Sequence, residues 1–191
     1  MSPRRLINIS GAGKNGEFPD PTGMTLSTVG ADGRPSGRVV LLKGVDAQGL
    51  VFYTNTRSRK GRDIAAHPDV SLSFWWPHLE SQVRFEGKAA LVSDAEADAY
   101  FATRPRLSQL AAWASDQSAP LRSREELEGR FAELERRYQG KTVPRPPHWS
   151  GYRVVPISVE FWWNRPGRLH ERELYTRASP QGAWTRTLLN P

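Results

Sequence analysis

The chain has 191 residues, of which 38% are hydrophobic and 25% are charged, so we expect one folded domain rather than disorder. The absence of cysteine excludes disulfide bonds, thiol catalysis and cysteine–zinc sites, and it makes the cytoplasm the default compartment. No apolar run approaches the roughly 18–20 residues that a membrane-spanning helix requires, and the first residues lack the apolar core of a secretory signal.

The formal net charge of +7 favours anionic partners, namely nucleic acid, a membrane surface or phosphorylated small molecules. Arginines far outnumber the five lysines. Because a planar guanidinium binds phosphate through two parallel hydrogen bonds, this balance suits a site for phosphate esters. The base composition of a genome produces the same bias, so the sequence leaves both explanations open.

From Met24 onward the sequence has the pattern of an antiparallel sheet, with short strands joined by tight turns. Residues 1–19 are rich in glycine, proline and charge, and we expect them to form a flexible segment before a folded domain over 20–191. The expected strands are 24–29, 37–44, 50–55, 70–76, 81–92, 152–163, 168–177 and 184–189.

Three segments between these strands carry helix signals. Ser58 can cap a short helix over 59–67. The strings SDAE and SREE are capping boxes, and they predict helices over 94–104 and 124–138. Many hairpin-linked strands with few helices predict a mainly β, α+β fold, a closed or split antiparallel β-barrel with flanking helices.

Two short motifs have the composition of phosphate-binding loops. GAGKNG (11–16) fits the dinucleotide-binding template, but the prolines that follow it prevent the helix that the template requires, so we interpret it as a flexible segment. RSRKGR (57–62) places Ser58, Arg59 and Lys60 where a strand should end and a helix begin. Free N–H groups and the helix dipole favour an anion there, although a solvated turn or a nucleic-acid surface has the same composition.

Cationic side chains also recur along the expected strands. Arg38 and Lys43 lie on an apolar strand, where a buried cation needs an anionic partner from this chain or from a ligand. Arg168, His170 and Arg172 alternate along another strand and would share one face. Three such groups repel one another unless something anionic lies against them, so this row is the strongest indication of an anion site from the residues alone.

A third group lies at helical spacing. Tyr100, Arg104 and Ser108 would share one face, although Pro105 must break or restart the helix between them. Such a row can bind a phosphate, and an ordinary amphipathic helix shows it too. Paired tryptophans such as Trp162 and its neighbour are more often part of a core or an interface than of a cofactor site.

Taken together, these strings resemble the pyridoxine/pyridoxamine 5′-phosphate oxidase family in their order and spacing, from Asp20 to the end of the chain. The resemblance implies an FMN-binding split β-barrel, with two FMN sites at the interface of a homodimer. The matching strings are DPTGM (20–24), GRVVLLKG (37–44), FYTNTRSRKG (52–61), QVRFEG (82–87), YFATRPRLSQLAAWASDQS (100–118), VPRPPHWSGYRV (143–154), EFWW (160–163) and RLHER (168–172).

The resemblance implies a role for each matching position. Arg59 and Lys60 would hold the FMN phosphate, and Gln82 would contact the flavin ring. The implied FMN-binding residues are Arg38, Val39, Val40, Leu41, Leu42, Lys43, Tyr53, Thr54, Arg59, Lys60, Gln82, Gln117, Ser118, Trp162 and Arg172, the last four largely from the partner subunit. The substrate phosphate would be bound by Lys43, Tyr100, Arg104 and Ser108, with Arg168 and His170 over the pyridine ring as substrate-binding and catalytic residues.

The implied reaction is oxidation of pyridoxine 5′-phosphate or pyridoxamine 5′-phosphate to pyridoxal 5′-phosphate. Hydride would leave the C4′ carbon for flavin N5, and O2 would reoxidise the flavin and yield hydrogen peroxide. We expect no metal ion, nucleic acid or membrane as a partner in this reaction.

Three departures from the family pattern leave alternatives open. The stretch before Asp20 is short and glycine-rich, so we expect it to be mobile without substrate and to add little affinity. The family's EFWQG and HDR are EFWWN and HER here, and RLHER also resembles phenazine-biosynthesis oxidases, which share the barrel and FMN but act on tricyclic substrates. A non-catalytic flavin- or nucleic-acid-binding module is the alternative from another class. The RVVLLK and RPRLSQLAAWAS strings favour the vitamin B6 enzymes.

Overall fold

The computed structural model describes residues 20–191, and nine strands in this range form one antiparallel sheet. The predicted flexible segment 1–19, with its GAGKNG motif, lies outside the described residues. The strands are β1 (Gly23–Val29), β2 (Pro35–Leu41), β3 (Gly44–Asp46), β4 (Gly49–Asn55), β5 (Asp69–Trp76), β6 (Ser81–Leu91), β7 (Trp149–Trp163), β8 (Glu171–Thr176) and β9 (Thr185–Leu188).

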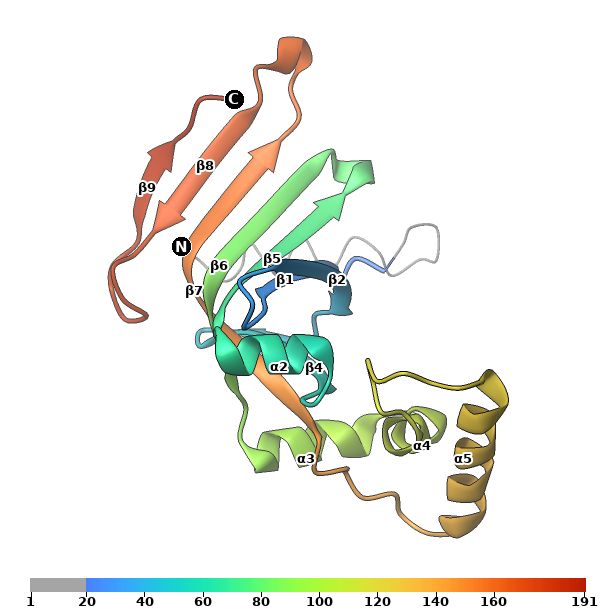
Figure 1. Cartoon of the computed structure of the whole chain (residues 1–191). Helices are drawn as coiled ribbons and strands as arrows, with labels where there is room; N and C mark the ends of the chain where they lie inside the picture. The colour runs from blue at the N-terminus through green and yellow to red at the C-terminus, as the bar shows by residue number, and fades with distance from the viewer. Residues whose placement is uncertain (1–19) are drawn as a thin grey trace.

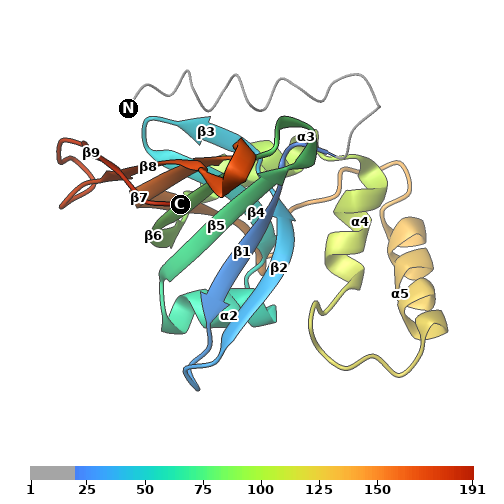
Figure 2. The ribbon, with the colours of Figure 1, turned by 90° about the horizontal axis from the view of Figure 1, so that it is seen from above.

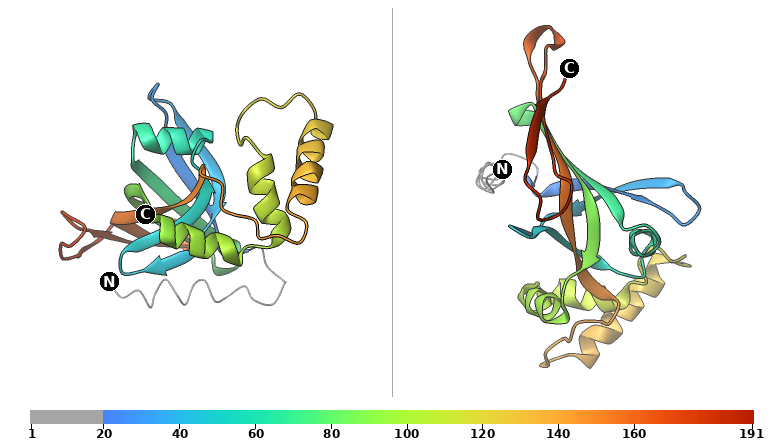
Figure 3. Two further views of the ribbon diagram at one scale, coloured as in Figure 1. Left: turned by 90° about the horizontal axis from the view of Figure 1, so that it is seen from below. Right: turned by 90° about the vertical axis from the view of Figure 1, so that its left-hand side faces the viewer.

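The sheet order is β2-β1-β5-β6-β7-β4-β3, and β8 pairs with β7 and then with β9. The sheet curls into a half-barrel, which is seen from its side in Figure 3. Four α-helices flank it in the described range: α2 (Arg59–Ala66), α3 (Asp94–Thr103), α4 (Arg106–Ala114) and α5 (Arg124–Arg137). This arrangement confirms the predicted mainly β split barrel with flanking helices.

Strand β7 is the longest strand of the sheet, with 15 residues. One of its edges pairs with β6 along most of its length. Its other edge pairs with β4 up to Val154 and with β8 from Ser158 onward. Pro156 lies in the interval between these partners, where its missing N–H removes no ladder hydrogen bond on that edge. The strand therefore connects two parts of the fold, the helices α3–α5 at one end and the β8–β9 hairpin at the other (Figure 1).

Two hydrophobic clusters stabilise this arrangement. The larger one fills the half-barrel with alternating side chains of the central strands, among them Leu26, Phe52 and Phe85, each at most 1% exposed. The smaller one includes Phe101, Leu110 and Trp149, and it attaches the helices to the ends of β4 and β7. Helices α4 and α5 lie side by side at the edge of the barrel (Figure 2).

The predicted strand over 37–44 divides in two. Strand β2 ends at Leu41, and β3 begins at Gly44. Between them the backbone changes partner, because the N–H of Leu42 donates to Thr22 O and that of Lys43 donates to Val51 O. The segment therefore crosses from β1 to β4. A run of apolar residues does not reveal this change of hydrogen-bonding partner.

The predicted break at Pro105 is confirmed, because Pro105 stands between α3 and α4, although α4 is a separate helix that the capping boxes did not predict. A prediction about the last strands needs correction. Strand β8 begins only at Glu171. Arg168 lies in a turn with a positive φ of 60°, so Arg168, His170 and Arg172 do not alternate along one strand face.

Helices in the described part of the chain are too short or too polar to cross a lipid bilayer.

The predicted cap of the first helix is confirmed, because the Ser58 side chain accepts from the N–H of Gly61. Gly61 itself is buried, and a Cβ on it would collide with the backbone carbonyl of Thr56. The tight approach of α2 to the end of β4 thus requires glycine at this position.

We predict that Gly61→Ala lowers the free energy of unfolding by about 1–3 kcal/mol, because the helix must move away from Thr56. The matched control is Gly129→Ala on α5, where an added Cβ meets nothing within 4 Å. That change should stabilise the helix by up to about 1 kcal/mol. Urea unfolding measures both, and equal effects of the two substitutions would contradict the packing argument.

Candidate functional site

Two adjoining clefts lie between the barrel and the helices, and they share a wall formed by Tyr53, Thr54, Arg104, Gln117 and Trp149. The first cleft has a volume of about 270 Å³ and the second about 310 Å³. Ten predicted site residues line the first: Val39, Val40, Leu41, Lys43, Tyr53, Thr54, Lys60, Tyr100, Arg104 and Gln117. Ser108 lines the second. Residues far apart in the sequence thus meet at one place.

Lys60 is a buried cation, only 9% exposed, at the start of α2. Its Nζ donates to Ser58 Oγ at 3.2 Å and to Gln117 Oε1 at 2.9 Å. Within residues 20–191 it forms no ion pair with a carboxylate. Burial lowers the pKa of Lys60, and the nearby charge of Arg38 lowers it further. A buried ammonium with only neutral partners is costly unless an anion binds beside it.

Arg38 is different, because it has an anionic partner within the chain. Its Nη2 lies 3.5 Å from Asp63 Oδ2, and its Nη1 donates to Thr28 Oγ1 at 2.6 Å. The Thr28 hydroxyl in turn donates to Asp63 at 2.7 Å. The alternative that the sequence left open, ion pairing inside the chain, therefore holds for Arg38. Lys43 is exposed and lines the first cleft.

Arg104 stands at the end of α3, and its guanidinium is packed against rings rather than carboxylates. Its Cζ lies 4.7 Å from the ring centroid of Trp149. Its Nη1 is buried and has no hydrogen-bond partner within the described residues. Burial lowers the pKa of Arg104, and the nearby Tyr100 opposes this shift. Arg104 faces both clefts, so it joins Tyr100 in the first cleft and Ser108 in the second.

A second group of predicted residues lies outside both clefts, on β6, β7, β8 and the turn before β8: Gln82, Trp162, Arg168, His170 and Arg172. Gln82 is opposite Trp162 in the β6–β7 ladder, and Trp162 is opposite Arg172 in the β7–β8 ladder. The rings of Trp162 and His170 are 4.6 Å apart. Arg172 donates to the buried Glu160 at 2.8 Å, so its anionic partner is a carboxylate of the same chain.

Gln117, Ser118 and Arg59 have different surroundings. Gln117, expected to serve largely the partner's site, contacts Lys60 and Thr54 of its own chain. Ser118 is exposed and has a positive φ of 73°. Arg59 is the exposed first residue of α2, next to Lys60.

Comparisons with known proteins decide the family. Residues 15–138 match the family model described as pyridoxamine 5′-phosphate oxidase, and residues 149–191 match the pyridoxine 5′-phosphate oxidase C-terminal dimerisation region. A relative from Myxococcus xanthus (strain DK1622), named pyridoxine/pyridoxamine 5′-phosphate oxidase, is 58% identical over 90% of this chain and 82% of its own length. A relative of the same name from Rubrobacter xylanophilus is 59% identical over 90% of this chain and 78% of its own.

The chain belongs to the pyridoxine/pyridoxamine 5′-phosphate oxidase family. It is an oxidase of this family, and its matched C-terminal dimerisation region supports a homodimer. That region contains Trp162, Arg168, His170 and Arg172, which is all of the second group of predicted residues except Gln82.

Two solved structures show the same architecture. PhzG from Burkholderia lata 383, in complex with tetrahydrophenazine-1-carboxylic acid, has a TM-score of 0.89 and 32% identity over 98% of this chain and 90% of its own. A pyridoxamine 5′-phosphate oxidase-related, FMN-binding protein from Nostoc punctiforme PCC 73102 has a TM-score of 0.79 over 100% of this chain and 99% of its own. At 21% sequence identity, this similarity shows that the two chains share a fold and nothing more.

The sequence reasoning gave no role to Trp149, Glu160 or Asp63, which contact predicted site residues. Trp149 lies opposite Asn55 in the β4–β7 ladder, and this pairing brings it to the cleft wall. Each lies far along the chain from the arginine that it contacts. The string HWSGYRV was a signal for Trp149 only through its likeness to the oxidase family.

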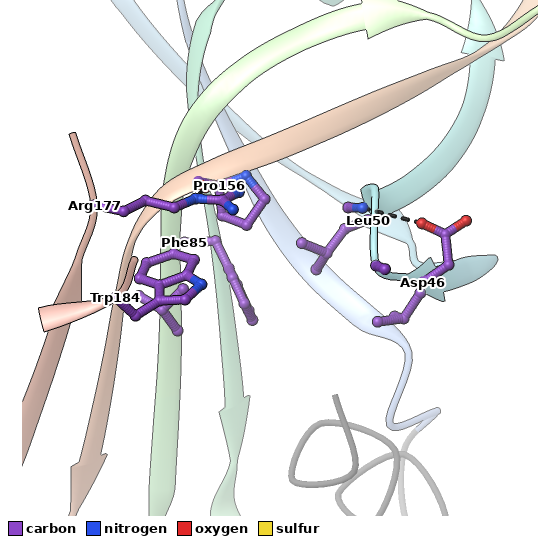
Figure 4. A pocket seen from close by; sticks show the side chains of 10 residues that line it. Asp46, Leu50, Phe85, Pro156, Arg177 and Trp184 are labelled. Carbon is purple, nitrogen blue, oxygen red and sulfur yellow. Dashed lines mark hydrogen bonds between the residues drawn. The ribbon is translucent and has the colours of Figure 1, made fainter. Parts of the chain in front are cut away.

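A separate cavity of about 100 Å³ lies between the β3–β4 hairpin, the middle of β6 and β7, and the segment that joins β8 to β9 (Figure 4). No predicted site residue lines it. Arg177 donates to the carbonyls of Pro156 and Pro180 and stacks over Trp184 at 4.5 Å. We interpret these contacts as structural, because they hold the segment after β8 against β7.

We predict that Lys60→Met stabilises the protein once bound small molecules have been removed. The free energy of unfolding should rise by about 1 kcal/mol or more, because the substitution removes a buried charge that has no carboxylate partner. Lys88→Met is the control, since Lys88 is exposed and pairs with Asp69 at 2.8 Å. It should change stability by less than about 0.5 kcal/mol. If urea unfolding shows that Lys60→Met destabilises the empty protein, Lys60 is a structural cation rather than an anion ligand.

Proposed function

We propose that this chain oxidises pyridoxine 5′-phosphate or pyridoxamine 5′-phosphate to pyridoxal 5′-phosphate, with FMN as its cofactor and O2 as the electron acceptor. The observation that carries the proposal is that Lys60 and Arg104 reach one cleft without carboxylate partners in the described chain. Cofactor and substrate each carry a phosphate, so the reaction needs two anion sites. The relatives named for this activity are 58–59% identical over 90% of the chain.

The start of α2 fits the FMN phosphate. The helix begins at Arg59, Ser58 caps it, and Lys60 presents a buried Nζ toward Gln117. Helix N–H groups and the helix dipole favour an anion at this end, and the two cations add charge-assisted hydrogen bonds. Phosphate oxygens would replace the neutral oxygens that Lys60 now contacts, which offsets the cost of its burial.

The wall around Arg104 fits the substrate phosphate. Arg104 has a buried N–H edge without a partner in the described residues, and Tyr100 and Ser108 supply hydroxyls from the neighbouring helices. Lys43 is in reach of the same cleft and would contribute to both sites. A guanidinium with free N–H groups binds phosphate bidentately, so it fixes the orientation of the substrate as well as its position.

The second group would complete the site in the dimer. Gln82, Trp162 and Arg172 would contact the cofactor, and Arg168 and His170 would lie over the pyridine ring. In one chain this group is outside the clefts, and the dimerisation match covers all of it except Gln82. We therefore propose that residues 20–191 act as one catalytic domain, with each site built from two subunits.

FMN held by these residues would supply the redox chemistry, a two-electron transfer from the C4′ carbon of the substrate to O2. For the alcohol, the substrate loses two hydrogens and O2 becomes hydrogen peroxide. For the amine, one water is also consumed and ammonia is released. The residues named above would bind the phosphates and orient C4′ toward the flavin.

The test of this proposal is aerobic incubation of the purified holoenzyme with pyridoxine 5′-phosphate. We expect pyridoxal 5′-phosphate and hydrogen peroxide in equal amounts, measured by absorbance and by a coupled peroxidase. PhzG supplies the competing substrate class, because its structure contains tetrahydrophenazine-1-carboxylic acid. Turnover of a tricyclic acid, with none of the phosphorylated vitamer, would overturn the proposed substrate.

We predict that Lys60→Met weakens FMN binding by about 1.5–3 kcal/mol, the range for a hydrogen bond to a charged group. Quenching of flavin fluorescence during titration of the empty protein measures the dissociation constant. Lys88→Met should leave it unchanged, because Lys88 pairs with Asp69 away from the clefts. A wild-type protein that is colourless and does not bind added FMN would contradict the cofactor assignment.

We predict that Arg104→Ala raises KM for pyridoxine 5′-phosphate about tenfold or more and leaves the FMN content intact, because Arg104 binds a phosphate that does not react. Steady-state kinetics and flavin absorbance of the same sample measure both. The opposite result, loss of flavin with an unchanged KM in the remaining holoenzyme, would mean that Arg104 belongs to the cofactor site.

A further inference from the structure

Three aromatic rings form one wall of the cleft with Arg104, and we call Tyr53, Tyr100 and Trp149 the ring wall. The Tyr53 and Tyr100 rings are 4.0 Å apart at an angle of 10°. The Tyr53 and Trp149 rings are 5.3 Å apart, also at 10°. The Arg104 guanidinium lies 4.7 Å from the Trp149 ring and 5.6 Å from that of Phe101. A flexible cation is thus packed against a rigid aromatic surface.

Several contacts fix the position of Trp149. It is the first residue of β7 and only 5% exposed. Its N–H donates to Pro146 O at 3.0 Å, and its carbonyl accepts from Arg145 at 2.8 Å. Arg145 is itself held by Asp94 and Asp98 of α3, at 2.7 Å and 2.5 Å. The backbone of Trp149 is therefore tied to the sheet and, through Arg145, to helix α3, while the indole packs edge-on against Phe101 at 5.0 Å.

The way in which an indole holds a guanidinium matters for phosphate binding. A cation above an aromatic ring is attracted to the face of the ring, and tryptophan gives the strongest attraction. A guanidinium that lies flat over a ring makes this contact through its face, and its N–H groups stay in its own plane. A carboxylate partner would occupy those N–H groups and compete with the phosphate. The Arg104 Cζ lies 4.7 Å from the Trp149 ring centroid, and its Nη1 has no hydrogen-bond partner within the described residues, so this donor is left for a ligand.

We propose that Trp149 is a positioning residue for the substrate's phosphate, and that its indole holds Arg104 in the orientation that binds it. This inference rests on the proposed function, since it assigns Arg104 to the substrate rather than to the cofactor. Trp149 then acts on KM through Arg104 and has little effect on kcat. A purely structural role in the cluster of Phe101 and Leu110 would instead act on stability alone.

The test compares Trp149→Leu and Trp149→Phe in the wild-type and Arg104→Ala backgrounds, with pyridoxine 5′-phosphate as substrate of the holoenzyme. We expect Trp149→Leu to raise KM about tenfold and to change kcat less than about threefold. Trp149→Phe keeps an aromatic face, but a phenyl ring attracts a cation less strongly than an indole, so it should raise KM by about two- to threefold. In the Arg104→Ala background Trp149→Leu should have no further effect on KM, because two residues that act as a unit are not additive.

Trp76→Leu is the matched control, because Trp76 is as buried as Trp149, at 6% exposed, and contacts neither cleft. It should lower the melting temperature as Trp149→Leu does and leave KM within about twofold. The dissociation constant of inorganic phosphate, measured by equilibrium dialysis against each holoenzyme, gives a second readout. It should rise in Trp149→Leu and remain unchanged in Trp76→Leu.

Two results would overturn the inference: an unchanged KM and phosphate affinity in Trp149→Leu, or an equal rise in KM in both backgrounds. If Trp149→Leu does not fold, Trp149→Phe decides in its place. Its rise in KM must disappear in the Arg104→Ala background. If neither KM nor the dissociation constant of inorganic phosphate rises in Trp149→Phe, the inference is wrong. A wild-type enzyme that does not turn over pyridoxine 5′-phosphate would overturn the proposed function instead. Phosphate affinity would then still decide whether Trp149 positions Arg104.

Discussion

The change of partner along one edge of β7 is the constraint on which the rest of the structure depends. Pro156 lies between the residues that pair with β4 and those that pair with β8. Because β7 serves both neighbours, one strand carries Trp149 at its start and Trp162 near its end. Trp149 lines the clefts between barrel and helices, and Trp162 lies outside both clefts, opposite Arg172 of β8. The two parts of the proposed site are thus opposite ends of a single strand.

The presence of a carboxylate partner distinguishes the structural cations from those that are available to a ligand. Arg38, Arg145 and Arg172 each meet carboxylates of the chain, and these pairs hold strands and helices together. Lys60 and Arg104 have only neutral oxygens, rings or no partner within residues 20–191, although burial disfavours their charged forms. A fold that keeps uncompensated cations in a cleft does so at a cost in stability, which a bound anion removes.

The aromatic residues around the clefts have a role beyond apolar burial. Nearly parallel rings hold Tyr53, Tyr100 and Trp149 in one wall, and the wall packs against a guanidinium without using its donors. In the second group, Trp162 similarly lies against the His170 ring. Both contacts place a flat aromatic surface beside a side chain that the proposed function assigns to substrate binding. Preorganised polar groups of this kind lower the cost of ordering a ligand.

The sequence by itself determined the element types and the family, and the tertiary structure decided which residues meet. Alternating apolar residues and the Ser58, SDAE and SREE caps are local signals, so most strands and three helices could be predicted. The order of motifs identified the family because many strings matched together. Three features could not be read locally: the crossing at Leu42 from β1 to β4, the start of β8 at Glu171, and the position of Trp149 beside Arg104. The first and third depend on partners distant in the sequence, and neither periodicity nor composition encodes such a pairing. The second depends on a turn in which Gly167 and Arg168 have positive φ, and the alternation of residues 168–172 conceals this turn.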